Sequence, residues 1–252
     1  MNYRPYTERR YRNTHSADGL QSFRVVVKQT DLLVKADREL ASETEDSVIT
    51  CRKLIEEYID RFPSFLYTLV PFPNDRFAPQ VVRDMIEAGR QAGVGPMAAV
   101  AGAIAEWVGQ DILRYSRQVI VENGGDVFIK TDGPLNVGIF AGASPLSNKV
   151  GIAIDPKGAP IAVCTSSGTV GHSLSMGKAD GVTIISRSAS LADAAATAVG
   201  NLVSGKGRMD QGLEFAQSIK GVIGVVIIVG GRLALKGDFE LVQIKGLGLD
   251  KK

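Results

Sequence analysis

The sequence is poor in cysteine and aromatic residues, and it has no long apolar run. Its 252 residues include two cysteines, one tryptophan and 6% aromatics. Two cysteines in sequence positions 51 and 164 exclude a disulfide scaffold and a zinc site built from four cysteines. The longest apolar run, 222–229, falls far short of the roughly 20 residues that a membrane-spanning helix needs, and residues 1–22 are too polar for a secretory signal. We therefore expect a cytoplasmic protein with no membrane partner and with free thiols.

The net positive charge of the sequence is confined to the N-terminal segment. Through Lys28 there are six basic and two acidic residues, whereas the remainder has 23 basic and 25 acidic residues. The mildly acidic body argues against a nucleic-acid partner. We expect a basic N-terminal arm over residues 1–22 and a single α+β domain over residues 23–252. The arm could reach an anionic ligand, dock an acidic partner or a second subunit, or remain a solvated tail; its arginines are Arg4, Arg9, Arg10 and Arg12.

The periodicity of apolar residues predicts a mixture of helices and strands. Helices are expected over 43–61, 80–91, 97–117, 191–202 and 209–219. Strands are expected over 23–27, 32–36, 118–122, 127–130, 135–141, 150–154, 161–165 and 181–186, with two more closing the chain. The prolines between 63 and 73 predict an extended linker. A strand hairpin, then helices, then strands and a mixed end together predict an α+β fold rather than a regular alternation.

The first candidate site segment is Asn123-Gly124-Gly125-Asp126, between two predicted strands. Asn-Gly is typical of a tight hairpin turn. The two glycines would also let a ligand approach the backbone, and Asp126 would supply a carboxylate. Both interpretations can hold together.

The second segment, 164–175, is rich in hydroxyl groups, glycines and unhindered amides, which suit phosphate or another anionic, nucleotide-type ligand. A flexible polar loop is the plain alternative. Cys164 beside His172 suggests a thiolate of lowered pKa, whereas the apolar residues before Cys164 favour a buried strand end. The candidate ligand-binding residues are Thr165, Ser166, Ser167, Gly168 and Thr169.

The third segment holds Asp193 and Thr197, four residues apart and therefore on the same face of a predicted helix. Such a pair can give a hard cation two oxygen ligands. Alternatively, Asp193 stabilises its own helix dipole and Thr197 is a core residue. The segment 200–207 has the spacing of a phosphate-binding loop, but Gly207 replaces the required Ser or Thr and a helix precedes it, so we interpret it as a helix end with a glycine cap.

Taken in order, these segments resemble the ApbE flavin transferase superfamily over roughly residues 95–201. The parallels are the helix after Gly95, Asn123-Gly124-Gly125-Asp126, Thr165-Ser166-Ser167-Gly168 and the Ala-Asp-x-x-x-Thr segment ending at Thr197. The resemblance implies an ApbE-like architecture with antiparallel sheets and packed helices. It also implies FAD or FMN as cofactor and Mg²⁺ held by Asp193 and Thr197.

Two features depart from the transferase pattern. No lysine follows the small residues of the early helix, and the His-x-x-Asp-Pro-x-Thr-Gly segment is compressed into 171–180. His172 and Asp180 are the candidate catalytic residues that remain there. The chain looks more like an uncharacterised cytosolic sister family, linked in anaerobes to sulfide assimilation and homocysteine formation, which shares the run from Thr165 to Ser173.

Three functions follow from these observations. The chain could hold a flavin nucleotide with a divalent cation and carry out phosphoryl or FMN transfer. It could serve sulfide assimilation or homocysteine biosynthesis, as an enzyme or accessory protein, through Cys164 and His172. It could also be a non-catalytic member of the fold that binds a ligand, a client protein or a pathway partner, as a monomer or a homo-oligomer.

Overall fold

The computed structural model describes residues 19–167, 179–203 and 208–244. Most of the expected basic arm lies outside these ranges, as do Gly168, Thr169 and His172. In the described residues, all strand pairs are antiparallel and the helices pack on them, which confirms the α+β prediction.

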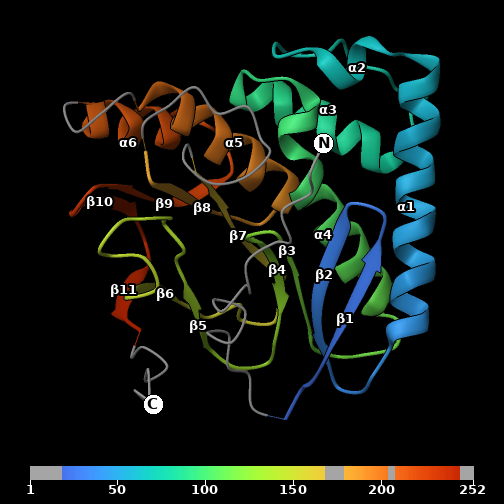
Figure 1. Cartoon of the computed structure of the whole chain (residues 1–252), viewed down its shortest axis with the longest axis horizontal. Coiled ribbons are helices and arrows are strands. Elements are labelled where there is room, and N and C mark those ends of the chain that lie inside the picture. The colour runs from blue at the N-terminus through green and yellow to red at the C-terminus, as the bar shows by residue number, and fades with distance from the viewer. Residues whose placement is uncertain (1–18, 168–178, 204–207, 245–252) are drawn as a thin grey trace.

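Two antiparallel sheets form the framework (Figure 1). The larger has the order β1-β2-β3-β4-β7-β8-β9-β10, and the smaller has the order β11-β6-β5. Their bounds are β1 Gln21–Val27, β2 Thr30–Ala36, β3 Val119–Asn123, β4 Asp126–Lys130, β5 Leu135–Gly138, β6 Val150–Ile154, β7 Ile161–Ser166, β8 Gly181–Ser186, β9 Val222–Val229, β10 Arg232–Gly237 and β11 Glu240–Gln243.

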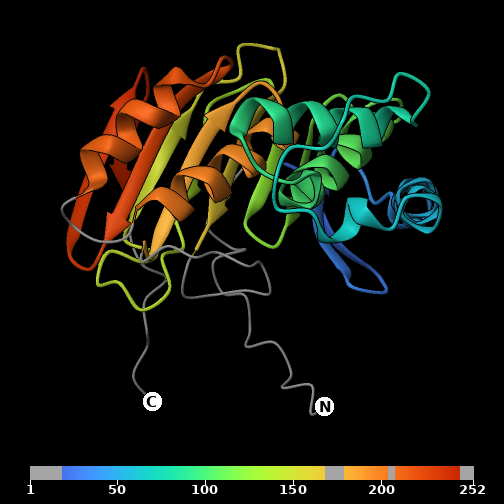
Figure 2. The ribbon, with the colours of Figure 1, turned by 90° about the horizontal axis from the view of Figure 1, so that it is seen from above.

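The helices pack over one face of the larger sheet, as the view from above shows (Figure 2). They are α1 Ala41–Arg61, α2 Ser64–Tyr67, α3 Gln80–Ala92, the 3₁₀ helix η2 Pro96–Ala99, α4 Val100–Ile112, α5 Ala189–Leu202 and α6 Met209–Ser218. The short α2 interrupts the predicted extended linker. The helix end expected within 200–207 is found at Leu202, whereas the predicted glycine cap lies outside the described residues.

The helix predicted over 97–117 is wrong at both ends. It begins as 3₁₀ at Pro96, and α4 ends at Ile112. The reason for the early end is a contact distant in sequence: Ser116 Oγ accepts from the Asp37 amide at 2.9 Å, and the Arg117 amide donates to Asp37 Oδ2 at 2.7 Å. These bonds tie the chain beyond α4 to the end of β2 instead of continuing the helix.

Alternation along the strands divides the apolar residues between two cores. On β4, Phe128 packs toward the helices, whereas Val127 and Ile129 pack toward the smaller sheet. On β7, Cys164 and Val163 divide in the same way. Successive side chains of a strand point to opposite faces, so the middle of the larger sheet, from β3 to β9, is buried on both sides and lies between a helical layer and the smaller sheet.

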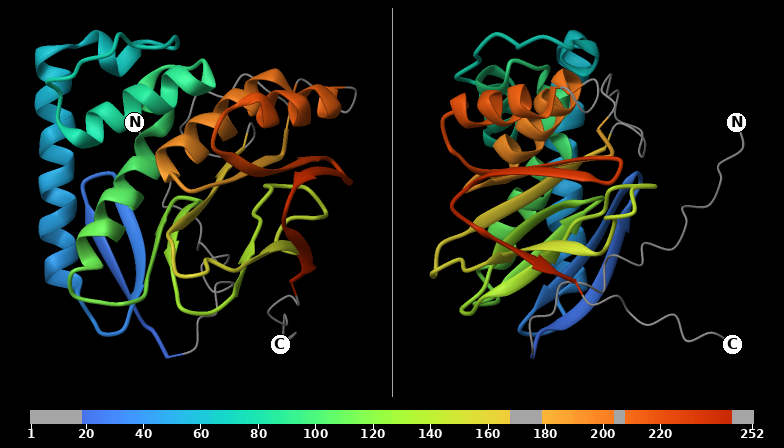
Figure 3. Two further views of the ribbon diagram at one scale, coloured as in Figure 1. Left: turned by 180° about the vertical axis from the view of Figure 1, so that it is seen from behind. Right: turned by 90° about the vertical axis from the view of Figure 1, so that its left-hand side faces the viewer.

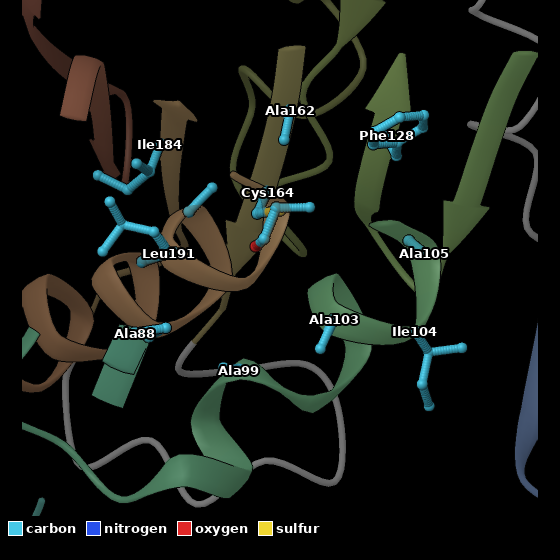
Figure 4. Close-up of a cluster of buried hydrophobic side chains, with 14 of the residues drawn as sticks. Ala88, Ala99, Ala103, Ile104, Ala105, Phe128, Ala162, Cys164, Ile184 and Leu191 are labelled. Atoms are coloured by element: carbon cyan, nitrogen blue, oxygen red, sulfur yellow. The ribbon is translucent and has the colours of Figure 1, made fainter. Parts of the chain in front are cut away.

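Small residues bring α4 and α5 close together and close to the sheet (Figure 4). A Cβ atom built on Gly102 would lie 2.2 Å from the Ala189 carbonyl oxygen, and one built on Gly109 would lie 2.1 Å from the Phe128 ring. The Ala- and Gly-rich composition of α4 predicts such close packing. It places the first turns of α4 and α5 next to each other beneath the end of β7.

Among the described residues, no single helix is long and apolar enough to cross a membrane. The segments 80–92 and 96–112 reach that length and composition only as a pair, and they are bent by 106° at the break between them.

Candidate functional site

The β3–β4 hairpin turns through Gly124 and Gly125, whose φ angles are +68° and +115°. Glycine adopts positive φ without the steric cost of a Cβ atom, so the Asn-Gly prediction of a tight turn is confirmed. Glu122 Oε1 accepts from the Gly125 amide at 3.0 Å, and Asn123 Nδ2 donates to the Ala101 carbonyl at 3.0 Å. The turn is thereby attached to the start of α4.

Asp126 begins β4 and lies opposite Cys164 of β7. It is 7% exposed, and the Cys164 thiol and the Thr165 amide both hydrogen-bond its carboxylate. Within the described residues, its Oδ1 atom is buried without a hydrogen-bond partner. Because a buried carboxylate oxygen without a partner is energetically costly, this atom requires an explanation.

Asp193 lies in the first turns of α5 and reaches the first turn of α4. Its Oδ2 atom accepts from the Gly102 amide at 2.9 Å, and the carboxylate also accepts from the Ala101 amide. The first backbone amides of a helix have no acceptor within that helix, so those of α4 need an acceptor from elsewhere. The predicted dipole role of Asp193 is therefore partly correct, but the dipole belongs to α4 rather than to its own helix.

A second carboxylate makes the reverse connection. Glu106 of α4 accepts through Oε2 from the amides of Ala189 and Ser190 at 2.8 and 3.2 Å, and from the Ser188 hydroxyl at 3.1 Å. Each of the two helices thus caps the N-terminus of the other. Sequence reasoning did not single out Glu106; the available signal was an acidic residue midway along an Ala- and Gly-rich helix.

Asp126 and Asp193 interact through their charges, although 66 residues separate them in the chain. Burial is the main cause that raises the pKa of Asp126 well above its ordinary value, and the charge of Asp193 is the second. Burial likewise raises the pKa of Asp193 to about 7, against the lowering effect of the Gly102 and Ala101 amides. When both buried carboxylates are ionised, a positive charge placed between them would stabilise their charged forms.

This burial predicts a pH-dependent stability in the absence of divalent cations. An unfolded chain holds Asp193 at its ordinary pKa of 3.8, whereas the folded protein raises it to about 7. The folded state thus binds the proton more tightly, so the stabilisation is complete below pH 3.8 and is lost as the pH rises through 7. We expect wild type to lose roughly 2–4 kcal/mol over this window relative to Asp193→Asn, measured by urea unfolding in EDTA. Parallel pH profiles of the two proteins would contradict this.

The donor set fits a hard cation only in part. No group of three or more His, Cys, Asp and Glu residues suited to a metal ion is present in the described ranges. Asp126 and Asp193 would supply two carboxylates, and Asp126 Oδ1, which has no partner in the described part of the chain, is an oxygen of the kind that Mg²⁺ prefers. Thr197 lies one turn further along α5 and is 9% exposed. A complete shell would therefore need hydroxyl, carbonyl, water or phosphate oxygens as well.

Some of the other predicted site residues lie near the Asp126–Asp193 pair, whereas others make contacts elsewhere. Thr165 lies beside the glycine turn, since a Cβ atom built on Gly125 would be 3.5 Å from its carbonyl oxygen, but its hydroxyl is bonded to the Thr183 hydroxyl at 2.9 Å. Ser166 ends β7 and Ser167 follows it. Asp180 instead accepts from the Gly230 amide at 2.5 Å, which anchors the β9–β10 turn. Within the described ranges it has no hydrogen bond or ion pair to Asp126 or Asp193.

Cys164 has the surroundings of a structural thiol. It is fully buried, and its sulfur lies 3.5 Å from the Ala189 carbonyl oxygen. Burial, followed by the charge of Asp126, raises its pKa well above the ordinary value. A reactive thiolate requires the opposite environment, so this geometry favours the buried strand end over the sulfur-handling interpretation.

The chain is similar to proteins of one family over most of its length. The family model described as AbpE bacteria matches residues 12–235. A UPF0280 protein of Methanocaldococcus jannaschii is 37% identical over 227 residues, which cover 87% of this chain and 92% of the relative. A UPF0280 protein of Methanococcus vannielii is 41% identical over 214 residues, covering 82% and 87%.

Solved structures of flavin transferases have the same fold. The apo flavinyl transferase ApbE of Pseudomonas stutzeri matches with a TM-score of 0.54 at 16% identity, covering 86% of this chain and 94% of that one. Flavin transferase ApbE of Vibrio cholerae matches with a TM-score of 0.54 at 15% identity, covering 90% and 98%. The resemblance seen in the sequence is thereby confirmed at the level of family and fold. The match over 12–235 and the UPF0280 relatives show that this chain belongs to the AbpE bacteria family.

Proposed function

We propose that the chain binds a flavin nucleotide, FAD or FMN, together with a divalent cation at the Asp126–Asp193 pair, and that it acts on the phosphate-bearing part of the nucleotide. The observation that carries this proposal is the electrostatic interaction of two buried carboxylates, one of which has an oxygen without a hydrogen-bond partner among the described residues. A cation between them would relieve their mutual repulsion and satisfy that oxygen. The fold shared with flavin transferases supports the choice of nucleotide.

The surrounding residues suit this role. The glycines of the β3–β4 turn let a ligand approach the backbone, and the hydroxyl-rich residues at the end of β7 offer hydrogen bonds to phosphate. When bound, the divalent cation would neutralise charge that develops on the pyrophosphate. Asp126 and Asp193 would hold it, and the Gly102 amide would keep Asp193 in place through its 2.9 Å hydrogen bond.

Calorimetry tests the proposal directly. We expect the purified protein to bind FAD in the presence of MgCl₂ and to lose that binding when EDTA replaces the magnesium, because the two carboxylates repel the pyrophosphate without a cation. Parallel titrations with FMN and ADP show which half of FAD is recognised. Absence of heat with FAD at high magnesium would contradict the proposal.

Chromatography of the same mixtures separates an enzyme from a non-catalytic binder. Cleavage of the pyrophosphate by water gives FMN and AMP in equal amounts, and transfer of FMN to a client protein gives AMP and a flavin bound to protein. FAD that binds and remains intact would indicate a ligand-binding member of the fold.

A further inference from the structure

The chain between α1 and α3 carries most of the large apolar side chains that the described residues expose. Seen from behind, this segment runs along the outer margin of the helical layer, and its helix α2 contacts α1 and η2 (Figure 3). Five of the nine large hydrophobic residues exposed in the described ranges lie between positions 66 and 77. We name these five the apolar margin: Leu66, Tyr67, Leu69, Val70 and Phe77. Single exposed apolar residues are normal, whereas a concentration of them marks an interaction surface.

Contacts on its inner side fix the backbone of this segment. Phe65 is fully buried, and its ring packs edge-on against Tyr58 and Phe72 at centroid distances of 5.0 and 5.3 Å. The Leu69 carbonyl accepts from the Gly95 amide at 3.0 Å. A Cβ atom built on Gly95 would lie 1.9 Å from a backbone oxygen of the segment, so the close approach requires glycine. The outward side chains are therefore held in place before a partner binds, which lowers the entropic cost of association.

The apolar margin is large enough for an interface between two copies of the chain. Tyr67 and Phe77 are 75% and 82% exposed. Leu69 and Val70 are 57% and 65% exposed. With roughly 150–250 Å² for an aromatic side chain and about 100 Å² for an aliphatic one, the margin presents roughly 450 Å². Two copies in contact, together with the polar rim around each margin, would bury roughly 1,000 Å², which is the lower range of specific interfaces.

The charges at the two ends of the segment favour a second copy as the partner. Residues 62–74 contain no charged residue, and Asp60 and Arg61 precede them while Asp75 and Arg76 follow, so the rim has no net charge. The ion pairs of the described residues leave Asp60, Arg61 and Arg76 unengaged. An anionic membrane or a strongly acidic protein would require arginines alone. In a symmetric dimer both copies present the same surface, so a rim with both signs supplies its own complement.

We propose that a second copy of this chain binds at the apolar margin, and that the two copies form a symmetric dimer about a two-fold axis through it. The apolar side chains of one copy pack against those of the other. At the rim, Asp60 of each copy faces an arginine of the other, either Arg61 or Arg76. The margin does not include Asp126 or Asp193, so the dimer and the flavin nucleotide are independent proposals.

Analytical ultracentrifugation of the full-length protein, from nanomolar to high micromolar concentration, measures the association. We expect a reversible equilibrium between monomer and dimer, because an interface near the lower size limit gives moderate affinity. A protein that stays monomeric throughout this range would overturn the proposal. Flotation with phosphatidylglycerol vesicles tests the other occupant: a monomer that binds these vesicles would assign the surface to a membrane and would also overturn the dimer.

Variants of the apolar margin show whether the dimer uses this surface. We expect Tyr67→Ser and Phe77→Ser each to weaken dimerisation by about tenfold or more, because each removes an aromatic anchor and enters the two-fold interface twice. Both side chains are exposed, so the melting temperature of the dilute monomer should stay at the wild-type value. Leu235→Ser is the matched control, since Leu235 is exposed on β10, at the edge of the larger sheet opposite to β1. A dimer that tolerates both margin substitutions would overturn the proposal.

Charge reversal at the rim tests the two-fold pairing. Arg61→Glu/Arg76→Glu makes the rim wholly acidic, and we expect it to weaken dimerisation by about tenfold or more through repulsion between like rims. Asp60→Lys makes the rim basic and should weaken dimerisation in the same way. Because the two variants have rims of opposite sign, an equimolar mixture should form a mixed dimer more tightly than either variant pairs with itself. A mixture that associates no better than the separate variants would overturn the proposed pairing.

Discussion

Replacing Asp193 by asparagine should abolish magnesium-dependent FAD binding without unfolding the protein. Asparagine keeps an oxygen that can accept from the Gly102 amide, so the contact between α4 and α5 persists. It loses the negative charge, and with it half of the carboxylate pair. We expect the affinity for FAD in MgCl₂ to fall by about 100-fold or more, since removal of a supporting outer ligand alone costs 10- to 100-fold. Calorimetry measures this directly.

Asp210→Asn is the matched control, because Asp210 is an exposed carboxylate in the first turn of α6. It should bind FAD as wild type does. Thermal unfolding in EDTA at pH 8 adds a second readout: because asparagine carries no buried charge, the melting temperature of Asp193→Asn should lie above that of wild type. A variant that loses binding but also melts far below wild type would show a structural role for Asp193 and not a ligand role.

Replacing Gly102 by alanine should cause the largest loss of stability of any single methyl addition near the site. The added Cβ atom would lie 2.2 Å from the Ala189 carbonyl oxygen, 2.7 Å from its carbon and 2.9 Å from the Asp193 Cβ atom. Two of these are backbone atoms, which cannot rotate away, so α4 and α5 must separate. We expect a loss of about 3 kcal/mol or more in the free energy of unfolding, measured by urea denaturation.

Gly133→Ala is the control for this change, since a Cβ atom there meets nothing within 4 Å. Its effect should stay within about 0.5 kcal/mol of wild type. Equal stability of the two alanine variants would show that the first turns of α4 and α5 can move apart freely. Such mobility would contradict the close packing on which the geometry of the carboxylate pair depends.

Local sequence signals predicted the elements well where neighbours along the chain determine the structure. The hairpin of β1 and β2, the helix α1 and the Asn123-Gly124 turn all follow from periodicity or turn chemistry within a few residues. The end of α4 did not, because Asp37, 79 and 80 residues away from Ser116 and Arg117 in the chain, holds those residues outside the helix. No periodicity within a window encodes such a bond.

The same distinction applies to the candidate site. The sequence identified Asp126 and Asp193 as oxygen donors, and the structure brings the turn, the end of β7 and the start of α5 to one place. The sequence could not indicate that the Gly102 amide donates a hydrogen bond to Asp193, because the two residues are 91 positions apart. The roles given to Gly168, Thr169 and His172 stay predictions, since those residues lie outside the described ranges.

The mutual capping of α4 and α5 has a consequence for how the site opens. If the first turn of α4 frays, Asp193 loses its amide donors, and if the first turn of α5 frays, Glu106 loses those of Ala189 and Ser190. Either event leaves a buried carboxylate without its amide donors, which favours further opening of the contact between the two helices. The two helix starts therefore form one cooperative unit of local unfolding. Their amide protons should exchange with solvent at a common rate, slower than those at the ends of α3 or α6.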